Sequence, residues 1–127
     1  MADRKSTFED LNCWKAGREL YLFIRREIIS TFPPSEKYDL TSQILRSARS
    51  VKANIAEGYG RFHYKDDAKF LSYARGSAHE TLDHLLTAMD DGYINQETLN
   101  QGRKLIDDSI RLINGYRAYV LRRQKGD

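Results

Sequence analysis

The 127-residue sequence has one cysteine, two prolines and no long apolar run. Because Cys13 has no partner within the chain, an internal disulfide is excluded, and a reducing cytoplasm is the expected location. The prolines are adjacent, at Pro33 and Pro34, which leaves long segments on either side free to be helical. The longest purely apolar run, residues 20–24, is far shorter than the ~20 residues of a membrane span, and no secretory signal is visible.

Charge is unevenly distributed along the chain, although the formal net charge is only +3. Residues 46–78 carry seven basic and three acidic side chains, and residues 79–108 carry two basic and seven acidic ones. Residues 109–127 carry five basic side chains and one acidic one. This pattern indicates either an anionic partner or helices that complement one another within or between subunits.

Apolar residues recur at steps of three and four in four segments, and no β-alternation of useful length is present. Asp66 and Asp67 suit the positive N-terminal end of the third segment. Since the connections are short, neighbouring helices should be antiparallel, and residues 1–127 should form one all-α domain, an up-down-up-down four-helix bundle. The predicted helices cover about residues 8–31, 39–58, 65–90 and 95–123.

Proline and glycine mark the expected helix ends. Pro33 and Pro34 should end the first helix, because the residue before a proline is pushed out of helical geometry. Gly58 and Gly60 should end the second, because glycine adopts the left-handed turn at a helix end without steric cost. Gly92, after Asp91, should end the third.

Two anomalies point beyond a single copy of the bundle. Glycines interrupt the helical segments, each at a cost of ~1 kcal/mol relative to alanine, which indicates close helix crossing within the chain or close contact between subunits. The first helix is apolar almost all round over residues 20–24 and 28–29, which predicts a subunit interface. The interrupting glycines are Gly17, Gly76, Gly102 and Gly115.

No set of residues has the mutual roles that a reaction needs, so the chain is predicted not to be an enzyme and to need no cofactor. Glu80 and His84 share a helix face, but the Glu-x-x-His pair of di-iron bundles is missing, so no metal site is expected. Cys13, beside Trp14, is predicted to be a small core or interface residue rather than a nucleophile.

Arg75 lies near the apolar side of the third predicted helix. A guanidinium there needs a partner, because an unpaired buried charge is costly. Glu57 and Glu19 are the candidate partners. A salt bridge that pins helices together and a role in ligand binding both remain open at this point.

Nucleic-acid binding through basic surfaces is the function that the residue pattern favours. Arginine engages phosphate, and tyrosine can stack on an unpaired base. Tyr116 and Tyr119 are interleaved with the cations of the last helix, although a helix dipole also favours cations at this end. The candidate phosphate contacts are Arg111, Arg117, Arg122, Arg123 and Lys125, with Arg46, Arg49 and Arg61 as secondary candidates.

Ordinary helix building does not explain residues 54–61, Asn-Ile-Ala-Glu-Gly-Tyr-Gly-Arg. Two glycines at a helix end reduce helix stability, so a tight corner, a close contact or a ligand must offset the loss. We expect Asn54 and Glu57 to hold the corner between the second and third helices through hydrogen bonds.

With this motif the chain resembles the small four-helix-bundle proteins encoded within intervening sequences of bacterial large-subunit ribosomal RNA genes. The resemblance covers nearly the whole chain, from Phe8-Glu9-Asp10-Leu11 and Trp14 to Leu82 and Leu85-Leu86. At residues 51–53 this chain has Val-Lys-Ala, where members of the family often carry a serine and a proline. The motif positions expected to be structural are Asn54, Glu57, Gly58, Gly60, Arg75, Gly76, Ser77 and Glu80.

The resemblance implies a cytoplasmic homo-oligomer without catalytic activity, with a homopentameric ring as the expected form. The chain is also similar to the accessory variability determinant of diversity-generating retroelements, a basic pentameric bundle that binds nucleic acid and a reverse transcriptase. Two hypotheses follow. One is a non-enzymatic ring that binds structured RNA or another nucleic acid. The other is an oligomeric scaffold for a protein partner, such as a polymerase or reverse transcriptase.

Overall fold

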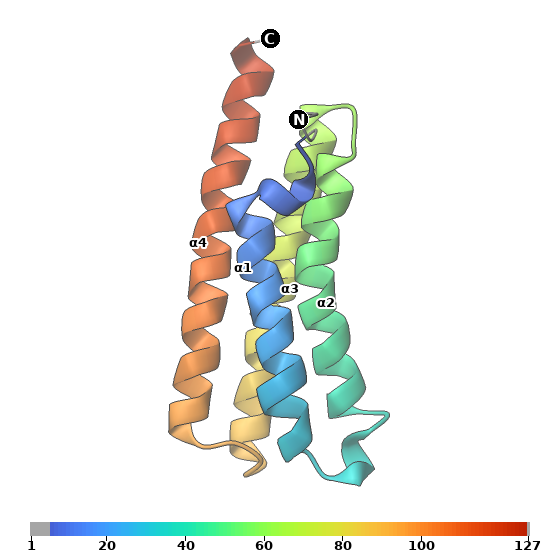
Figure 1. The fold of residues 1–127 in the computed structure, drawn as a ribbon, viewed down its shortest axis with the longest axis vertical. Coiled ribbons are helices and arrows are strands. Elements are labelled where there is room, and N and C mark those ends of the chain that lie inside the picture. The colour runs from blue at the N-terminus through green and yellow to red at the C-terminus, as the bar shows by residue number, and fades with distance from the viewer. Residues whose placement is uncertain (1–5, 127) are drawn as a thin grey trace, which may run out of the picture.

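The computed structural model describes residues 6–126, and their side chains as far as Arg123. Within this range the chain is helical and has no strand. Consecutive helices pack side by side in alternating directions and α1 also packs on α4, so the predicted all-α up-down-up-down bundle is confirmed (Figure 1). No helix in the described range is long and apolar enough to cross a membrane. The long helices are α1 (Asn12–Phe23), α2 (Leu40–Tyr59), α3 (Tyr64–Asp90) and α4 (Gln96–Gly126).

The first predicted helix, residues 8–31, is not continuous. It begins with a short 3-10 turn, Phe8–Asp10, which Thr7 caps by accepting a hydrogen bond at Oγ1 from the backbone N–H of Glu9 (3.1 Å). Leu11 is then extended, with φ −72° and ψ 130°, so α1 starts at Asn12. The chain bends here because the capping box closes a turn that is not continued.

The far end of this helix first widens and then tightens before it ends. After Phe23 the helix continues as a π-helical segment, Ile24–Ile28, and then as a 3-10 turn, Ile29–Thr31. Phe32 is extended (ψ 143°), as expected for the residue before Pro33.

A 3-10 turn, Pro34–Glu36, connects this segment with α2. The carboxylate of Glu36 accepts a hydrogen bond from the backbone N–H of Leu40 (3.2 Å) and one from the hydroxyl of Tyr93 (2.7 Å). The second bond raises the pKa of Tyr93 to about 12. Glu36 therefore caps α2 and ties its start to the α3–α4 connection.

The interior is built from apolar residues of all four helices. On α1, Trp14 and Tyr21 are half-buried at the edge of the core. Leu22 and Phe23, on a second apolar side of α1, are likewise half-buried within the single chain. The apolar residues at steps of three and four in α2 are all buried: Leu40, Ile44, Ala48, Val51 and Ile55.

A left-handed glycine ends α3 but not α2. Gly92 has φ +79°, as expected for the end of α3. Gly60 has φ −77° and ψ −6°, and α2 continues through Gly58 to Tyr59. Gly60 is the C-cap of α2, so the predicted place of the helix end is confirmed, whereas the predicted left-handed geometry of Gly58 and Gly60 is wrong.

Gly58 is needed for space rather than for backbone freedom. A Cβ at this position would lie 2.7 Å from Oδ1 of Asp67 and 3.0 Å from Cβ of Phe70. These distances are shorter than ordinary van der Waals contact, so only glycine lets the first turns of α3 pack this closely on the last turn of α2.

Two of the four mid-helix glycines pack against other helices of the same chain. A Cβ on Gly17 would lie 3.2 Å from a side chain of α2, and one on Gly102 would lie 2.6 Å from Cδ1 of Leu85. Gly76 and Gly115 are exposed, and a Cβ on either would meet nothing within 4 Å. Close crossing inside the chain is confirmed for Gly17 and Gly102 and does not explain Gly76 and Gly115.

Candidate nucleic-acid interface

The arginines of α4 do not form one continuous surface. Arg117 is half-buried, and its Nε donates a hydrogen bond to the carbonyl oxygen of Ala68 (3.1 Å). This bond ties α4 to α3, so Arg117 has a structural role. Arg111 is exposed, and its guanidinium lies 3.5 Å from the carboxylate of Asp108, one turn earlier.

Arg123 connects α4 with the start of α3. Its NH1 donates to the hydroxyl of Tyr119 (3.2 Å), and its guanidinium carbon lies 5.8 Å from the ring centroids of both Tyr64 and Tyr119. The hydroxyls of Tyr64 and Tyr119 raise the pKa of Arg123 further. Arg122 is exposed and makes no ion pair with a described residue. The side chain of Lys125 lies outside the described residues, so its phosphate contact stays a prediction.

The start of α3 lies beside the last turns of α4, because the Arg123 guanidinium carbon is 5.8 Å from the ring centroid of Tyr64. We call Phe62, His63, Tyr64, Tyr119 and Arg123 the aromatic corner. Phe62 is 92% exposed, and His63 contacts it edge to face with ring centroids 5.0 Å apart. The sequence prediction included Tyr119 and Arg123 but missed the other three. The available signal was three consecutive aromatic rings at the α2–α3 connection, of which Tyr64 packs against the core and Phe62 does not.

The secondary candidates Arg46 and Arg49 lie on the exposed face of α2, as the helical wheel predicts. Both line a groove of about 530 Å³, and neither makes an ion pair within the described part of the chain. The groove therefore offers two free guanidinium groups to an anion. Its other lining residues are Ser50, Ala53, Asn54, Glu57 and Phe70.

Glu57 and Arg61 form an ion pair at the end of α2, with Oε1 and NH2 2.9 Å apart. The Arg61 guanidinium also lies 4.7 Å from the ring centroid of Phe70 on α3. Glu57 therefore reaches α3 only through Arg61. Both members of the pair are exposed, so the pair stabilises the corner by about 0–1 kcal/mol.

Asn54 does not bridge the corner, contrary to the prediction. Its Nδ2 donates to the carbonyl oxygen (2.9 Å) and the hydroxyl (2.8 Å) of Ser50, one turn earlier in α2. Ser77 on α3 donates to the same Ser50 hydroxyl (2.9 Å). A short amide side chain readily bonds its own preceding turn. Asn54 thus supports a serine bridge between the middles of the two helices.

Arg75 pairs with neither Glu57 nor Glu19, so the predicted salt bridge is wrong. Its NH1 donates to Oδ1 of Asn114 on α4 (2.9 Å). Because Arg75 is only half-buried, a neutral amide partner is sufficient and the charge remains partly solvated.

Glu80 and His84 share a face of α3, as predicted, and their Oε2 and Nε2 atoms lie 3.1 Å apart. His84 is buried, whereas Glu80 is exposed. Among the residues that the structure describes, no three His, Cys, Asp or Glu side chains are grouped so that they could hold a metal ion.

A buried carboxylate lies beside Gly58 at the α2–α3 corner. Asp67 is 7% exposed, and its Oδ1 has no hydrogen-bond partner. Burial raises the pKa of Asp67 to about 6 and that of Cys13 to about 11. Burial and then the Asp67 carboxylate raise the pKa of Tyr116. The sequence prediction placed Asp67 at the positive N-terminal end of the helix dipole and did not expect it to be buried. The available signal was the spacing: Asp67 lies four residues before the buried Leu71, and residues four apart share one face of a helix.

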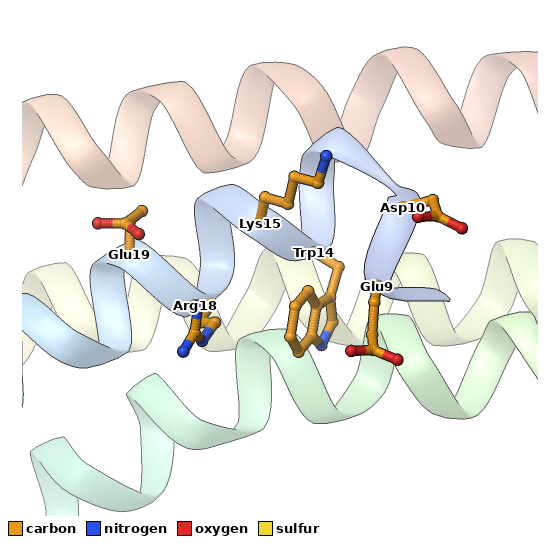
Figure 2. A pocket seen from close by; sticks show the side chains of 6 residues that line it. All are labelled: Glu9, Asp10, Trp14, Lys15, Arg18 and Glu19. Atoms are coloured by element: carbon orange, nitrogen blue, oxygen red, sulfur yellow. The ribbon is translucent and has the colours of Figure 1, made fainter. Parts of the chain in front are cut away.

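A hollow along α1 does not suit a polyanion. Its volume is about 630 Å³, and it contains three carboxylates and two cations around Trp14 (Figure 2). The Trp14 ring also contacts Phe8 edge to face, with centroids 5.2 Å apart. The lining residues are Glu9, Asp10, Trp14, Lys15, Arg18 and Glu19.

Comparison with known proteins gives a family match over most of the chain. The family model described as 23S rRNA-intervening sequence protein matches residues 9–115. A crystal structure of a protein with unknown function from the S23 ribosomal protein family of Bacteroides thetaiotaomicron is similar, with a TM-score of 0.66. It shares 23% sequence identity, over 82% of this chain and 96% of that one, and shows the fold alone. No curated protein matches the chain.

Proposed function

The chain belongs to the 23S rRNA-intervening sequence protein family, and on that premise we propose that it is a non-enzymatic homo-oligomer that binds nucleic acid through basic surfaces. Structured RNA is the expected ligand, a pentameric ring the expected assembly and the cytoplasm the expected location. The observation that carries the proposal is the stretch 109–126, which has five Lys and Arg residues and no Asp or Glu.

Several cations on these surfaces lack an acidic partner. Arg46, Arg49 and Arg122 are exposed and make no ion pair with a described residue. A free surface cation that meets a phosphate displaces a condensed counterion, and this release drives nucleic-acid binding at low salt. A ring would repeat the same surface in every subunit and strengthen its field.

Two exposed glycines support the oligomer. Gly76 and Gly115 each lower helix stability by ~1 kcal/mol relative to alanine, and no contact inside the chain requires them. Close approach of a second copy would require small residues at these places.

A titration of labelled structured RNA at about 50 and about 200 mM salt tests the binding, with light scattering for the mass of the assembly. We expect a mass of several subunits and an affinity that falls steeply with added salt. A monomer, or the absence of RNA binding at low salt, would contradict the proposal.

A second candidate is a scaffold for a protein partner such as a polymerase or reverse transcriptase. The hollow around Trp14 favours this role because its mixed charges and aromatic ring suit a protein surface. A partner that stays bound at high salt in a pull-down, and is lost in Trp14→Ala, is the expected sign.

A further inference from the structure

Phe62 is the most exposed large apolar side chain in the described part of the molecule, at 92%. It lies in a connection where a polar residue would serve the turn equally well. From its surroundings we infer that the aromatic corner binds unpaired nucleobases, so that the chain prefers single-stranded segments and loops to duplex. This inference rests on the proposed function and narrows its ligand.

The first support is the shape of the corner. A hollow of about 470 Å³ is lined by Phe62, His63, Tyr64 and Lys65. This volume falls within the range of roughly 300–1,000 Å³ typical of small-ligand sites. Since Phe62 is almost fully exposed, its ring faces are available to a flat partner. Stacking on aromatic side chains is the common way in which proteins hold bases without reading their sequence.

The second support is the fixed cation at the same place. The Arg123 guanidinium carbon lies 5.8 Å from the ring centroids of Tyr64 and Tyr119. Its NH1 donates a 3.2 Å hydrogen bond to the Tyr119 hydroxyl, which fixes the orientation of the guanidinium. Tyr116 stacks on Tyr119 with centroids 6.0 Å apart and planes 23° apart, which holds that ring in place. The guanidinium is thus held beside Tyr64, which lines the same hollow as Phe62, and from there it can bind the phosphate that follows a stacked base.

The third support is the sign of the local charge. Residues 58–65 and 109–126, which come together at Tyr64 and Arg123, contain no acidic residue. Of the acids that flank residues 58–65 in the sequence, Glu57 is paired with Arg61, Asp66 is half-buried and Asp67 is buried. A duplex presents phosphates but hides its base faces, so it gains from the cations and not from Phe62. Only an unpaired segment uses both.

Anisotropy titrations of a labelled single-stranded RNA and a blunt duplex of equal length test the inference, with wild type, Phe62→Ala and Phe62→Leu. We expect wild type to prefer the single strand, and both variants to lose about 5- to 100-fold in single-strand affinity with little change for the duplex. Leucine keeps the apolar contact but not the aromatic face, so it separates stacking from burial. Phe62→Trp should retain the affinity.

Tyr38→Ala is the matched control. Tyr38 is 87% exposed and has a cation beside it, with Nζ of Lys37 5.2 Å from its ring centroid. Tyr38 precedes the 20-residue helix α2 and Phe62 follows it, so the two are separated by the length of the helix, about 30 Å. Its removal should leave both affinities unchanged.

A 5-iodouridine in the single strand should photo-crosslink within the aromatic corner, as located by mass spectrometry.

The outcomes separate the inference from the proposed function. Absence of RNA binding at low salt overturns both. Salt-dependent binding that is equal for duplex and single strand, or unchanged in Phe62→Ala, overturns the inference alone. A smaller assembly mass for Phe62→Leu shows that the corner is a contact between copies, which also overturns it.

Discussion

Gly58 and Asp67 share one small space at the α2–α3 corner. The absence of a side chain at residue 58 lets the carboxylate of Asp67 lie against the end of α2, where its Oδ1 finds no hydrogen-bond donor. An unsatisfied buried oxygen lowers stability when it is charged and much less when it is protonated. The central motif therefore places a close packing contact and a titrating group side by side.

Gly58→Ala should destabilise the fold by about 1–3 kcal/mol, because the added methyl overlaps Asp67 and Phe70. Gly60→Ala is the matched control. Its Cβ would lie 3.6 Å from the nearest carbonyl oxygen, an ordinary contact, and φ is −77°. We expect a change of less than about 0.5 kcal/mol there. Urea unfolding compares the two, and equal losses would contradict the steric account.

Asp67 should make stability depend on pH. Burial raises its pKa in the folded chain to about 6, whereas the unfolded value is about 3.9. Between these values the folded state holds a proton that the unfolded state has lost, so stability falls as the pH rises from about 4 to about 6. Below this window the stabilising contribution is fully present, and above it the contribution is gone.

Asp67→Asn should remove this dependence on pH. In wild type the free energy of unfolding should fall by an amount on the order of 2 kcal/mol between about pH 4 and about pH 6. Unfolding of both proteins at several pH values from about 4 to about 7 measures it. Parallel pH profiles for Asp67→Asn and wild type would show that another group titrates.

At the scale of elements, α4 combines two tasks along its length. Two of its residues form hydrogen bonds with α3: Asn114 accepts one from Arg75, and Arg117 donates one to the carbonyl of Ala68. Its last turns carry Arg122 on the outside. Positions only five residues apart therefore serve the fold and the proposed ligand separately.

Arg117→Met should lower the stability by about 1–3 kcal/mol, since the Ala68 carbonyl loses its donor, and should change RNA affinity little. Arg122→Gln should leave the stability within about 0.5 kcal/mol and reduce the slope of log affinity against log salt by about one. Thermal melts and salt titrations of both variants check the division. The reverse pattern would assign the phosphate contact to Arg117.

At the scale of the whole molecule, the bundle could be predicted because the core-facing positions repeat with the helix period in every segment. The end of α2 at Tyr59 was predicted to within one residue, whereas the break at Leu11 could not be predicted, since a capping box decides it. The exposure of Arg46 and Arg49 could be predicted, because the helix period places both opposite the apolar residues of α2. The partner of Arg75 did not, because it depends on how α3 and α4 are rotated against each other.

The exposed Gly115 offers a test of the proposed assembly, because its substitution by alanine should stabilise an isolated chain but weaken a closely packed assembly. In an isolated chain, Gly115→Ala should stabilise α4 by up to ~1 kcal/mol, because nothing lies within 4 Å of the new methyl. If copies pack closely there, the methyl weakens the assembly instead. We expect the second result, seen as a lower mass at low concentration in light scattering. Gly60→Ala serves as control, and a higher melting temperature with unchanged mass would contradict close packing.

Cys13 is the only thiol of the chain and is 2% exposed, in the core line of α1. Burial raises its pKa to about 11, so at neutral pH almost no reactive thiolate is present and no alkylating reagent can reach it. Modification therefore requires the N-terminal turns of α1 to detach. The rate at which a reagent labels Cys13 therefore reports local opening of these turns, without any engineered probe.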